Sequence, residues 1–347
     1  WLNIHMSWSS EIDSIFACNY FKNSKVTILH LSTRIQTSIK VIITLMAFGF
    51  IIWKLLKFDD LDLAWSLFSK QLKSAPRIWI IAALIGMPFN FYFEILKWNL
   101  LIRKCYPLSF KKASRAVFSG LTMAMLTPNR IGEMFSRVFV LPKDKRMIGI
   151  GYSGVNSLSQ MIIVQVFGLV GMGLLLLVFP FQDNSPHPFT YWVIAISIIS
   201  GLLLVLLFMN LNWINKLLKI LHMDQKYPGL SQAFESLTTR DKWQSLGLSF
   251  AKYAVFNVQF FLLLMYFGVD VSLSIGLPAI MTIFLLLNFL PVIAIGEAGI
   301  RGSVTLLILG LFSEAELGIL VASLFLWLLN VAGPALAGSF LMRKIKF

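Results

Sequence analysis

The chain has 347 residues, of which 57% are hydrophobic and 13% are charged, and its mean hydropathy is +0.77. These values exclude a soluble globular domain and indicate a polytopic, all-α membrane protein. The formal net charge of +14 does not predict a nucleic-acid partner, because the basic residues lie at the ends of apolar runs, where they set membrane topology.

Residues 1–36 are polar, mixed in sign and without a long apolar core. They predict a loose N-terminal extension rather than a signal peptide or a span, and residues 37–347 follow as a single transmembrane domain. Full membrane spans need about 20 apolar residues, and six runs qualify, near 38–56, 78–101, 147–178, 190–209, 246–267 and 316–340. The third run is over-long and starts with small residues, so we expect it to tilt or break.

The segment after the first run contains the acidic cluster Asp59-Asp60-Leu61-Asp62. Apolar and polar residues alternate at helical spacing over 62–72, which predicts an amphipathic helix on the membrane surface. Capping of that helix accounts for the carboxylates. The alternative is a membrane glycosyltransferase-like enzyme with a lipid-phosphate donor, whose carboxylates would bind a divalent metal or act as a base. The four histidines are scattered, so the sequence predicts no metal site and no cofactor.

Two further apolar regions, 113–141 and 276–312, are interrupted in the middle. The interruptions read TPNRIGEMFSR (127–137) and LPVIAIGEAGIRG (290–302). A helix over 113–127 would be only about 22 Å long, too short to cross the membrane, so both regions predict re-entrant helical hairpins. The predicted hinge or helix-break residues are Thr127, Pro128, Gly132, Pro291 and Gly296.

Positive charge sets the predicted topology. Lysine and arginine clusters flank the first interrupted region at 103–115 and 143–146, and the linker 210–245 and the C-terminal tail are also basic. All of these belong in the cytoplasm, as do both termini. The second hairpin then enters from the opposite face, and the halves, about 37–209 and 246–347, form an inverted repeat. Broken helices at corresponding places in such halves point to a transporter's central binding site.

Charge at bilayer depth costs about 2.5 to 3.5 kcal/mol per residue on insertion scales. In the first motif, Thr127 is predicted to cap a helix that starts at Pro128, which places Arg130 in its first turn. In the second, Gly299 is predicted to open the turn before Arg301. Two positive helix ends and two guanidinium groups would then face the membrane interior, where they would bind an anion, phosphate especially. The predicted substrate-binding set is Arg130, Glu133, Arg137, Glu297, Gly299 and Arg301.

A purely structural role for these charges is also open. Arg130 would pair with Glu133 or Glu94, and Arg301 with Glu297, only to neutralise charge and hold the hairpins in place. Arg137 lies four residues after Glu133, and it would either extend the site or anchor the hairpin at the membrane interface.

The motifs also carry a family resemblance. TPNRIGE with Arg137, the later Gly299-Ile300-Arg301 and the basic segment PLSFKKASRA (107–116) resemble the lysylphosphatidylglycerol synthase transmembrane region, or flippase-like, family over about 38–342. The resemblance implies a bacterial inner-membrane protein related to the flippase half of aminoacyl-phosphatidylglycerol synthases, which move modified phospholipid between leaflets. The matching positions are Arg130, Gly132, Glu133, Gly299 and Arg301.

The chain departs from the family pattern at Gly302, where many relatives have a glutamate after the arginine, and Glu297 lies four residues upstream of Arg301. No aminoacyl-transferase domain is recognised, so lysine transfer to lipid is not expected. The sequence therefore predicts a transporter rather than an enzyme, a translocase for a phospholipid or polyprenyl-phosphate lipid with an anionic headgroup. A lipid-modifying enzyme is a candidate partner. The remaining alternative is a non-transporting scaffold for an envelope enzyme.

Overall fold

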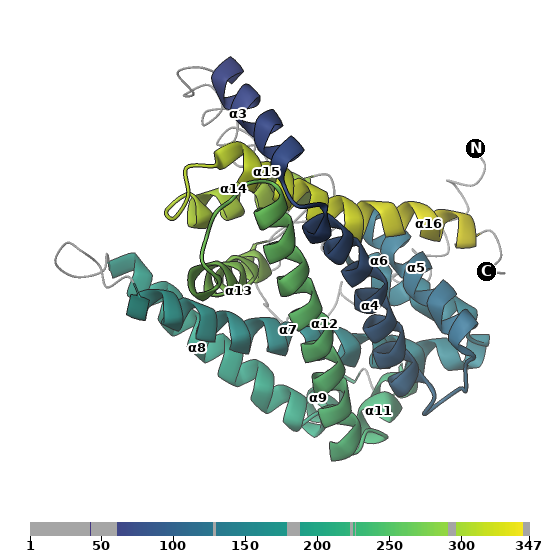
Figure 1. Ribbon diagram of the computed structural model, residues 1–347. Coiled ribbons are helices and arrows are strands. Elements are labelled where there is room, and N and C mark those ends of the chain that lie inside the picture. Colours follow the sequence, from purple (N-terminus) through teal and green to yellow (C-terminus); the bar gives the residue numbers. More distant parts are fainter. Residues whose placement is uncertain are drawn as a thin grey trace. The chain divides into compact units, whose positions relative to one another are not determined.

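The computed structural model describes residues 42, 61–127, 130–178, 188–222, 225, 227–290 and 296–342 (Figure 1). Within these residues every regular element is a helix, which confirms the all-α prediction. By internal contacts the chain divides into Trp1–Val41 and Ile42–Phe347, and all the helices named below belong to the second unit. The predicted extension at 1–36, and the span at 38–56 apart from residue 42, lie outside the described residues.

The helices occur in the following order. They are α3 (Leu61–Ser74), α4 (Arg77–Ile102), α5 (Phe110–Leu126), α6 (Ile131–Arg137), α7 (Arg146–Val178), α8 (Pro188–Met209), α9 (Asn212–Ile220), α11 (Pro228–Glu235), α12 (Thr239–Tyr266), α13 (Leu273–Phe289), α14 (Glu297–Leu309), α15 (Glu316–Trp327) and α16 (Gly333–Met342). Short 3₁₀ turns η2 (Val138–Val140) and η3 (Lys143–Lys145) precede α7, and a π-helical turn η5 (Leu328–Ala332) joins α15 to α16. The helix predicted at 62–72 is present as α3.

Four helical segments in the described part of the chain are long and apolar enough to cross a membrane: Arg77–Ile102, Lys143–Val178, Thr239–Tyr266 and Glu316–Leu341. They correspond to four of the six predicted spans. The prediction at 190–209 adds a fifth only if Ile194–Met209 and Asn212–Ile220, which are bent by 89°, count as one span.

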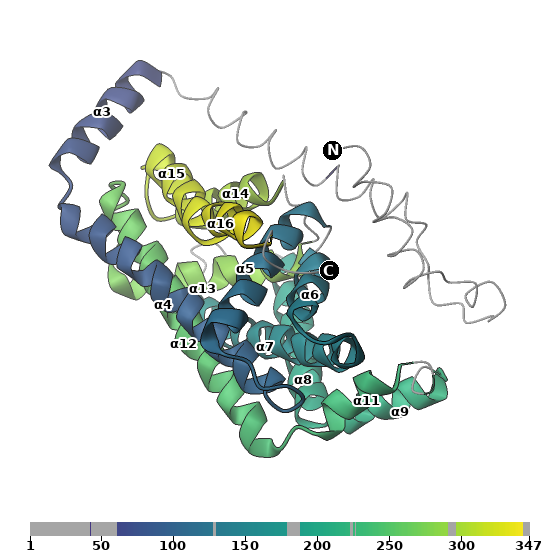
Figure 2. The same cartoon turned by 90° about the vertical axis from the view of Figure 1, so that its right-hand side faces the viewer.

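Of the tilt or break expected at the start of the over-long third run, the break is absent, because α7 continues unbroken from Arg146 to Val178. Its small residues serve helix packing instead. A Cβ atom at Gly151 would lie 2.6 Å from the Cβ of Ala233 on α11, so only glycine permits the two helices to approach this closely. Figure 2 shows α11 beside α9 at the end of the molecule where α7 begins.

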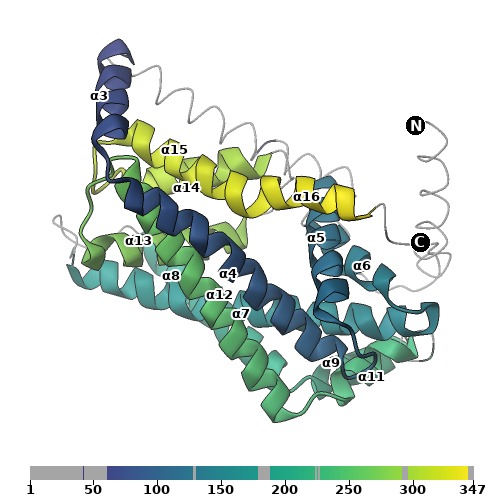
Figure 3. The same ribbon diagram turned by 45° about the vertical axis from the view of Figure 1, so that its right-hand side comes forward.

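Helices α4 and α12 lie side by side and run antiparallel (Figures 1 and 3). Near one end of the pair, Lys104 Nζ lies 2.8 Å from Asp241 Oδ2. Toward the other end, Gln259 Nε2 donates a 2.8 Å hydrogen bond to the backbone oxygen of Ala83. Buried apolar side chains such as Trp98 and Phe260 fill the space around the pair, which gives the interior charges described below a rigid support.

The two interrupted regions contact the rest of the molecule in matching ways. The first, α5 and α6, packs against α4 through α5, and α5 also contacts α16. The second, α13 and α14, packs against α12 through α13, and α13 also contacts α7. Contact between α7 and α13 is close, since a Cβ atom at Gly168 would lie 2.6 Å from Leu285 Cβ. Both interruptions are thereby held beside the α4–α12 pair.

Candidate functional site

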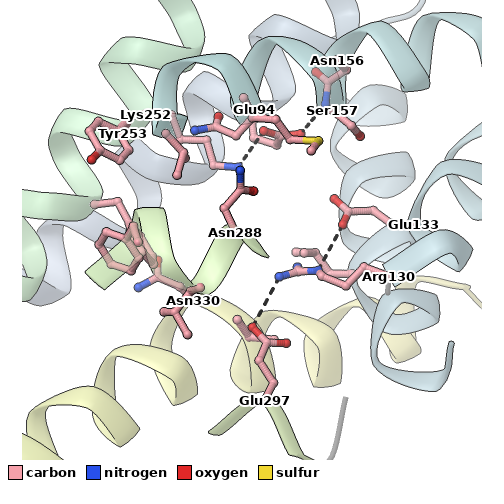
Figure 4. Close-up of a pocket in the computed structure, with 18 of the residues that line it drawn as sticks. Glu94, Arg130, Glu133, Asn156, Ser157, Lys252, Tyr253, Asn288, Glu297 and Asn330 are labelled. Carbon is pink, nitrogen blue, oxygen red and sulfur yellow. Dashed lines mark hydrogen bonds and ion pairs between the residues drawn. The ribbon is translucent and has the colours of Figure 1, made fainter. Parts of the chain in front are cut away.

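A cavity of about 800 Å³ lies among α4, α6, α7, α12, α13, α14 and η5 (Figure 4). Its charged lining residues are Glu94, Lys97, Arg130, Glu133, Lys252, Glu297 and Arg301. Side-chain amides add hydrogen-bonding groups, namely Asn90, Asn156, Gln160, Asn288 and Asn330. Much of the remaining wall is apolar and includes four phenylalanines, Phe91, Phe256, Phe284 and Phe289. The cavity therefore combines concentrated charge with surface suited to hydrocarbon.

The first motif places Arg130 in this cavity. Helix α5 ends at Leu126, and α6 begins at Ile131; the predicted helix start, Pro128, lies outside the described residues. Thr127 does cap the turn, because its hydroxyl accepts a 2.8 Å hydrogen bond from the Gly132 N–H. Arg130 is the N-cap residue and adopts the left-handed conformation, with φ 59°, which costs about 1 to 2 kcal/mol for a residue with a Cβ atom.

Gly132 is required at its position by close approach. A Cβ atom there would lie 2.6 Å from Thr127 Oγ1 and 2.7 Å from the backbone oxygen of Met123. The same Thr127 hydroxyl donates a 2.8 Å hydrogen bond to that oxygen. The end of α5 and the start of α6 are thus tied together, and Pro128 lies outside the described residues.

The second motif breaks before Gly296, not at Gly299. Gly296 is the N-cap residue of α14, whose first residue is Glu297, and Gly299 is buried inside the helix, so the prediction that Gly299 opens the turn is wrong. Because α14 starts at Glu297, Arg301 stands one helical turn away on the same face. Arg301 Nη2 donates a 3.1 Å hydrogen bond to Glu297 Oε1. Pro291 lies outside the described residues.

The two motifs, far apart in sequence, meet at Glu297 (Figure 4). Arg130 Nη1 lies 3.7 Å from Glu297 Oε1, the oxygen that also accepts from Arg301. On its other side, Arg130 Nε lies 3.5 Å from Glu133 Oε2. One carboxylate therefore stands between two arginines from different halves of the chain. Gly302 is buried in α14, so Glu297 supplies the carboxylate beside Arg301.

A second cluster centres on Glu94, deep in α4. Its carboxylate lies 2.8 Å from Arg137 Nη2, 2.7 Å from Lys252 Nζ and 3.4 Å from Lys97 Nζ. Asn156 Nδ2 donates a further 2.9 Å hydrogen bond to it. Arg137 also pairs with Glu133 and is only 2% exposed, so it bridges the two clusters inside the protein and does not anchor α6 at an interface.

Sequence reasoning missed part of this cluster. Neither Lys252 nor Lys97 is among the predicted site residues, although Lys97 is fully buried. Charged residues inside the apolar runs 78–101 and 246–267 were the available signal. The signal does not reveal partners, because Lys252 and Glu94 are 158 residues apart. Asn90 and Asn330, joined by a 2.9 Å hydrogen bond over 240 residues, were missed for the same reason.

Positive charge exceeds negative charge in the combined clusters. The cations are Lys97, Arg130, Arg137, Lys252 and Arg301, and the carboxylates are Glu94, Glu133 and Glu297. Five cations and three carboxylates leave a formal charge of +2. In addition, Nε and Nη1 of Arg301 are buried without a hydrogen-bond partner in the described part of the chain, a state that costs about 1 to 3 kcal/mol per unsatisfied group. These donors of Arg301 therefore lack acceptors, and an anion would supply them.

The long apolar helices and the buried charged cavity define a polytopic helical membrane protein with an internal polar site. The chain matches the family described as Lysylphosphatidylglycerol synthase TM region over residues 35–338, and it belongs to that family. The resemblance noted in the sequence is thus confirmed. Membership relates the chain to membrane proteins that modify or flip lipids. No curated protein matches the chain.

Proposed function

We propose that the protein is a bacterial inner-membrane lipid translocase that moves an anionic, phosphate-bearing headgroup through the central cavity between leaflets. The observation that carries this proposal is the excess of two positive charges, accompanied by two nitrogens of Arg301, Nε and Nη1, that have no hydrogen-bond partner among the described residues. A phosphate oxygen accepts hydrogen bonds from a guanidinium fork and contributes negative charge. If Lys97 were uncharged, one positive charge would still be in excess.

Arg130 is the group best placed to meet the headgroup first. Its side chain is 38% exposed, and its nearest carboxylate oxygen is 3.5 Å away, beyond the roughly 2.7 to 2.9 Å of a charge-assisted hydrogen bond. Arg301 is 12% exposed and is held at 3.1 Å by Glu297. A phosphate that approaches Arg130 would compete with Glu297 for both arginines. Headgroup binding is therefore proposed to loosen the contact between the two broken helices.

The proposed transport path uses an inverted repeat of two re-entrant hairpins. Helices α4 and α12, which begin corresponding triplets of elements, run antiparallel, as inverted topology requires. In the two halves α4 corresponds to α12, α5 to α13, and α7 to α16. The contacts agree with this correspondence, since α5 contacts α16 as α13 contacts α7, and α4 contacts α5 as α12 contacts α13. Both features support opposed hairpins that open in turn toward the cytoplasmic and external faces, with the acyl chains in the bilayer.

The test is transport by purified protein in liposomes that contain acyl-labelled phosphatidylglycerol, labelled polyprenyl phosphate or labelled phosphatidylcholine in separate arms. We expect transport of at least one phosphate-charged lipid and little transport of zwitterionic phosphatidylcholine. Arg130→Gln and Arg301→Gln are each expected to slow transport roughly 10- to 150-fold, the factor that corresponds to about 1.5 to 3 kcal/mol for a hydrogen bond to a charged group. Arg77→Gln, a change at an exposed arginine, serves as the matched control.

Several outcomes would overturn the proposal. Equal transport by wild type, Arg130→Gln and Arg301→Gln would show that the arginines do not handle the headgroup. A correctly inserted wild-type protein that moves none of the three lipids would favour the scaffold alternative. Metal-dependent sugar transfer that disappears in Asp60→Ala would favour the glycosyltransferase-like alternative, whose residue Asp60 lies outside the described residues.

A further inference from the structure

A second hollow, of about 510 Å³, lies between the end of α4 and the beginning of α12. It is lined by Leu96, Asn99, Leu100 and Arg103 of α4 and by Gln244, Gly247 and Leu248 of α12. We call these seven residues the α4–α12 groove. None of them lines the central cavity, so the groove occupies a different face of the same helix pair, and the proposed function does not use it.

The groove is graded in polarity along its length. At its outer end lies Arg103, and Arg240 precedes Gln244 by one turn on α12 and is exposed. Leu100 and Asn99 follow on α4 and Gln244 follows on α12, and Leu96 and Leu248 come last. From Arg103 back to Leu96 the distance along α4 is about 10 Å at 1.5 Å per residue. Because α4 and α12 are antiparallel, the basic groups of both helices lie at one end, and Leu96 and Leu248 lie toward the other.

The positive charge at that end is not neutralised within the described residues. Asp241, the carboxylate closest in sequence, pairs with Lys104 at 2.8 Å, and no ion pair joins Arg103 or Arg240 to any residue that the structure describes. The adjacent Trp243 is 61% exposed, as is typical of tryptophan at a membrane interface. Positive charge and an interfacial aromatic at one end match the headgroup level of a bilayer.

The groove also has unfilled space and an unused acceptor. A Cβ atom at Gly247 would have no heavy atom within 4 Å. Asn99 has a buried Oδ1 without a hydrogen-bond partner in the described part of the chain. A ligand with both a negative charge for the arginines and a hydroxyl for an amide oxygen would satisfy these groups.

We propose that the α4–α12 groove binds one anionic diacyl phospholipid from the surrounding leaflet, with its phosphate at Arg103 and Arg240 and its acyl chains against the leucines. Basic pockets between transmembrane helices on the cytoplasmic side bind anionic lipid headgroups, and positive charge places this end of the pair in the cytoplasm. The bound lipid stays in place beside α4 and α12 and is not the molecule transported through the central cavity.

The experiment measures lipid retained by the purified full chain in mixed micelles with equal amounts of phosphatidylglycerol and phosphatidylcholine, by native mass spectrometry. Gly247→Leu should fill the groove and remove one bound phosphatidylglycerol. Gly173→Leu is the matched control, because a Cβ atom at Gly173 also meets nothing within 4 Å and Gly173 lies on α7, outside the groove. Arg103→Gln should weaken retention about fivefold, as expected from roughly 1 kcal/mol per basic residue at the membrane surface.

Retention of phosphatidylglycerol that is equal in Gly247→Leu and Gly173→Leu would overturn the proposal and would assign the groove to another occupant, such as a further segment of this chain. Equal retention of phosphatidylcholine and phosphatidylglycerol by wild type would also overturn it. The two sites are distinct if Arg301→Gln loses headgroup transport but keeps the groove lipid. They are also distinct if Gly247→Leu loses the groove lipid but keeps headgroup transport.

Discussion

The charge cluster around Glu94 allows a quantitative prediction. One carboxylate, 5% exposed, faces three cations at 2.7, 2.8 and 3.4 Å, of which Lys97 is fully buried and Arg137 is 2% exposed. The substitution Glu94→Gln keeps the shape of the side chain but removes its charge and replaces one acceptor oxygen by an NH2 donor. Lys97 and Arg137 then remain buried with less compensation, so we expect a large loss of stability.

The magnitude follows from the distances. At an effective dielectric constant of about 20, opposite unit charges 2.8 Å apart attract by about 6 kcal/mol, and the cost of desolvating the ions offsets most of that attraction. Removal of one partner from a buried ion pair leaves the other desolvated and uncompensated, and it typically costs about 3 to 5 kcal/mol. We therefore expect Glu94→Gln to lower the free energy of unfolding by about 3 to 5 kcal/mol.

A second substitution tests the cause of the loss. Lys97→Met removes one buried positive charge while a straight side chain still fills the space, so Glu94→Gln/Lys97→Met has the wild-type net charge. We expect the double variant to recover at least half of the lost stability, because contacting charges couple strongly in double-mutant cycles. Unfolding is measured in detergent by circular dichroism. Glu314→Gln, at an exposed carboxylate, is the control and is expected to stay within about 0.5 kcal/mol of wild type.

The reasoning would be refuted if Glu94→Gln were as stable as Glu314→Gln, or if Lys97→Met made Glu94→Gln less stable. The first result would mean that water or another anion compensates the cations. The second would mean that Lys97 contributes packing or hydrogen bonds, such as its 3.1 Å bond to Ser249 Oγ, that outweigh its charge.

Two further predictions concern packing and reactivity. Gly171→Ala should destabilise the protein by about 1 to 3 kcal/mol, because its Cβ atom would lie 2.5 Å from Met281 Cβ and 2.8 Å from the backbone oxygen of Pro278. Gly173→Ala is the control and should not destabilise the protein, because the space at that position is open. Equal thermal unfolding temperatures of the two variants would contradict the close contact of α7 with α13. Burial raises the pKa of the Cys105 thiol above its ordinary value, so maleimide labelling in a Cys18→Ser background should still accelerate above about pH 10, where a thiol with a pKa of about 8.5 is almost fully ionised. A plateau by about pH 10 would show that Cys105 is open to water.

The helical class and four of the long helices could be predicted from hydropathy, since α4, α7, α12 and the α15–α16 segment each fall on a predicted apolar run. The interruptions at 127–137 and 290–302 could also be located, because charge within an apolar run is visible in the sequence. The exact start of each new helix could not. It depends on contacts such as the bond between Thr127 and Gly132. In the second motif α14 begins directly after Gly296, which is a predicted helix-break residue, and not at the turn expected at Gly299.

By itself, the sequence determined that this is a multi-helix membrane protein with two charged interruptions, because hydropathy and charge are properties of neighbouring residues and the membrane acts on them segment by segment. Only the tertiary structure decided which charges share an environment. It placed Glu297 between Arg130 and Arg301, and it made Glu94 the partner of Arg137 and Lys252. Electrostatic energy depends on separation in space and on burial, and packing of helices from distant parts of the chain fixes both.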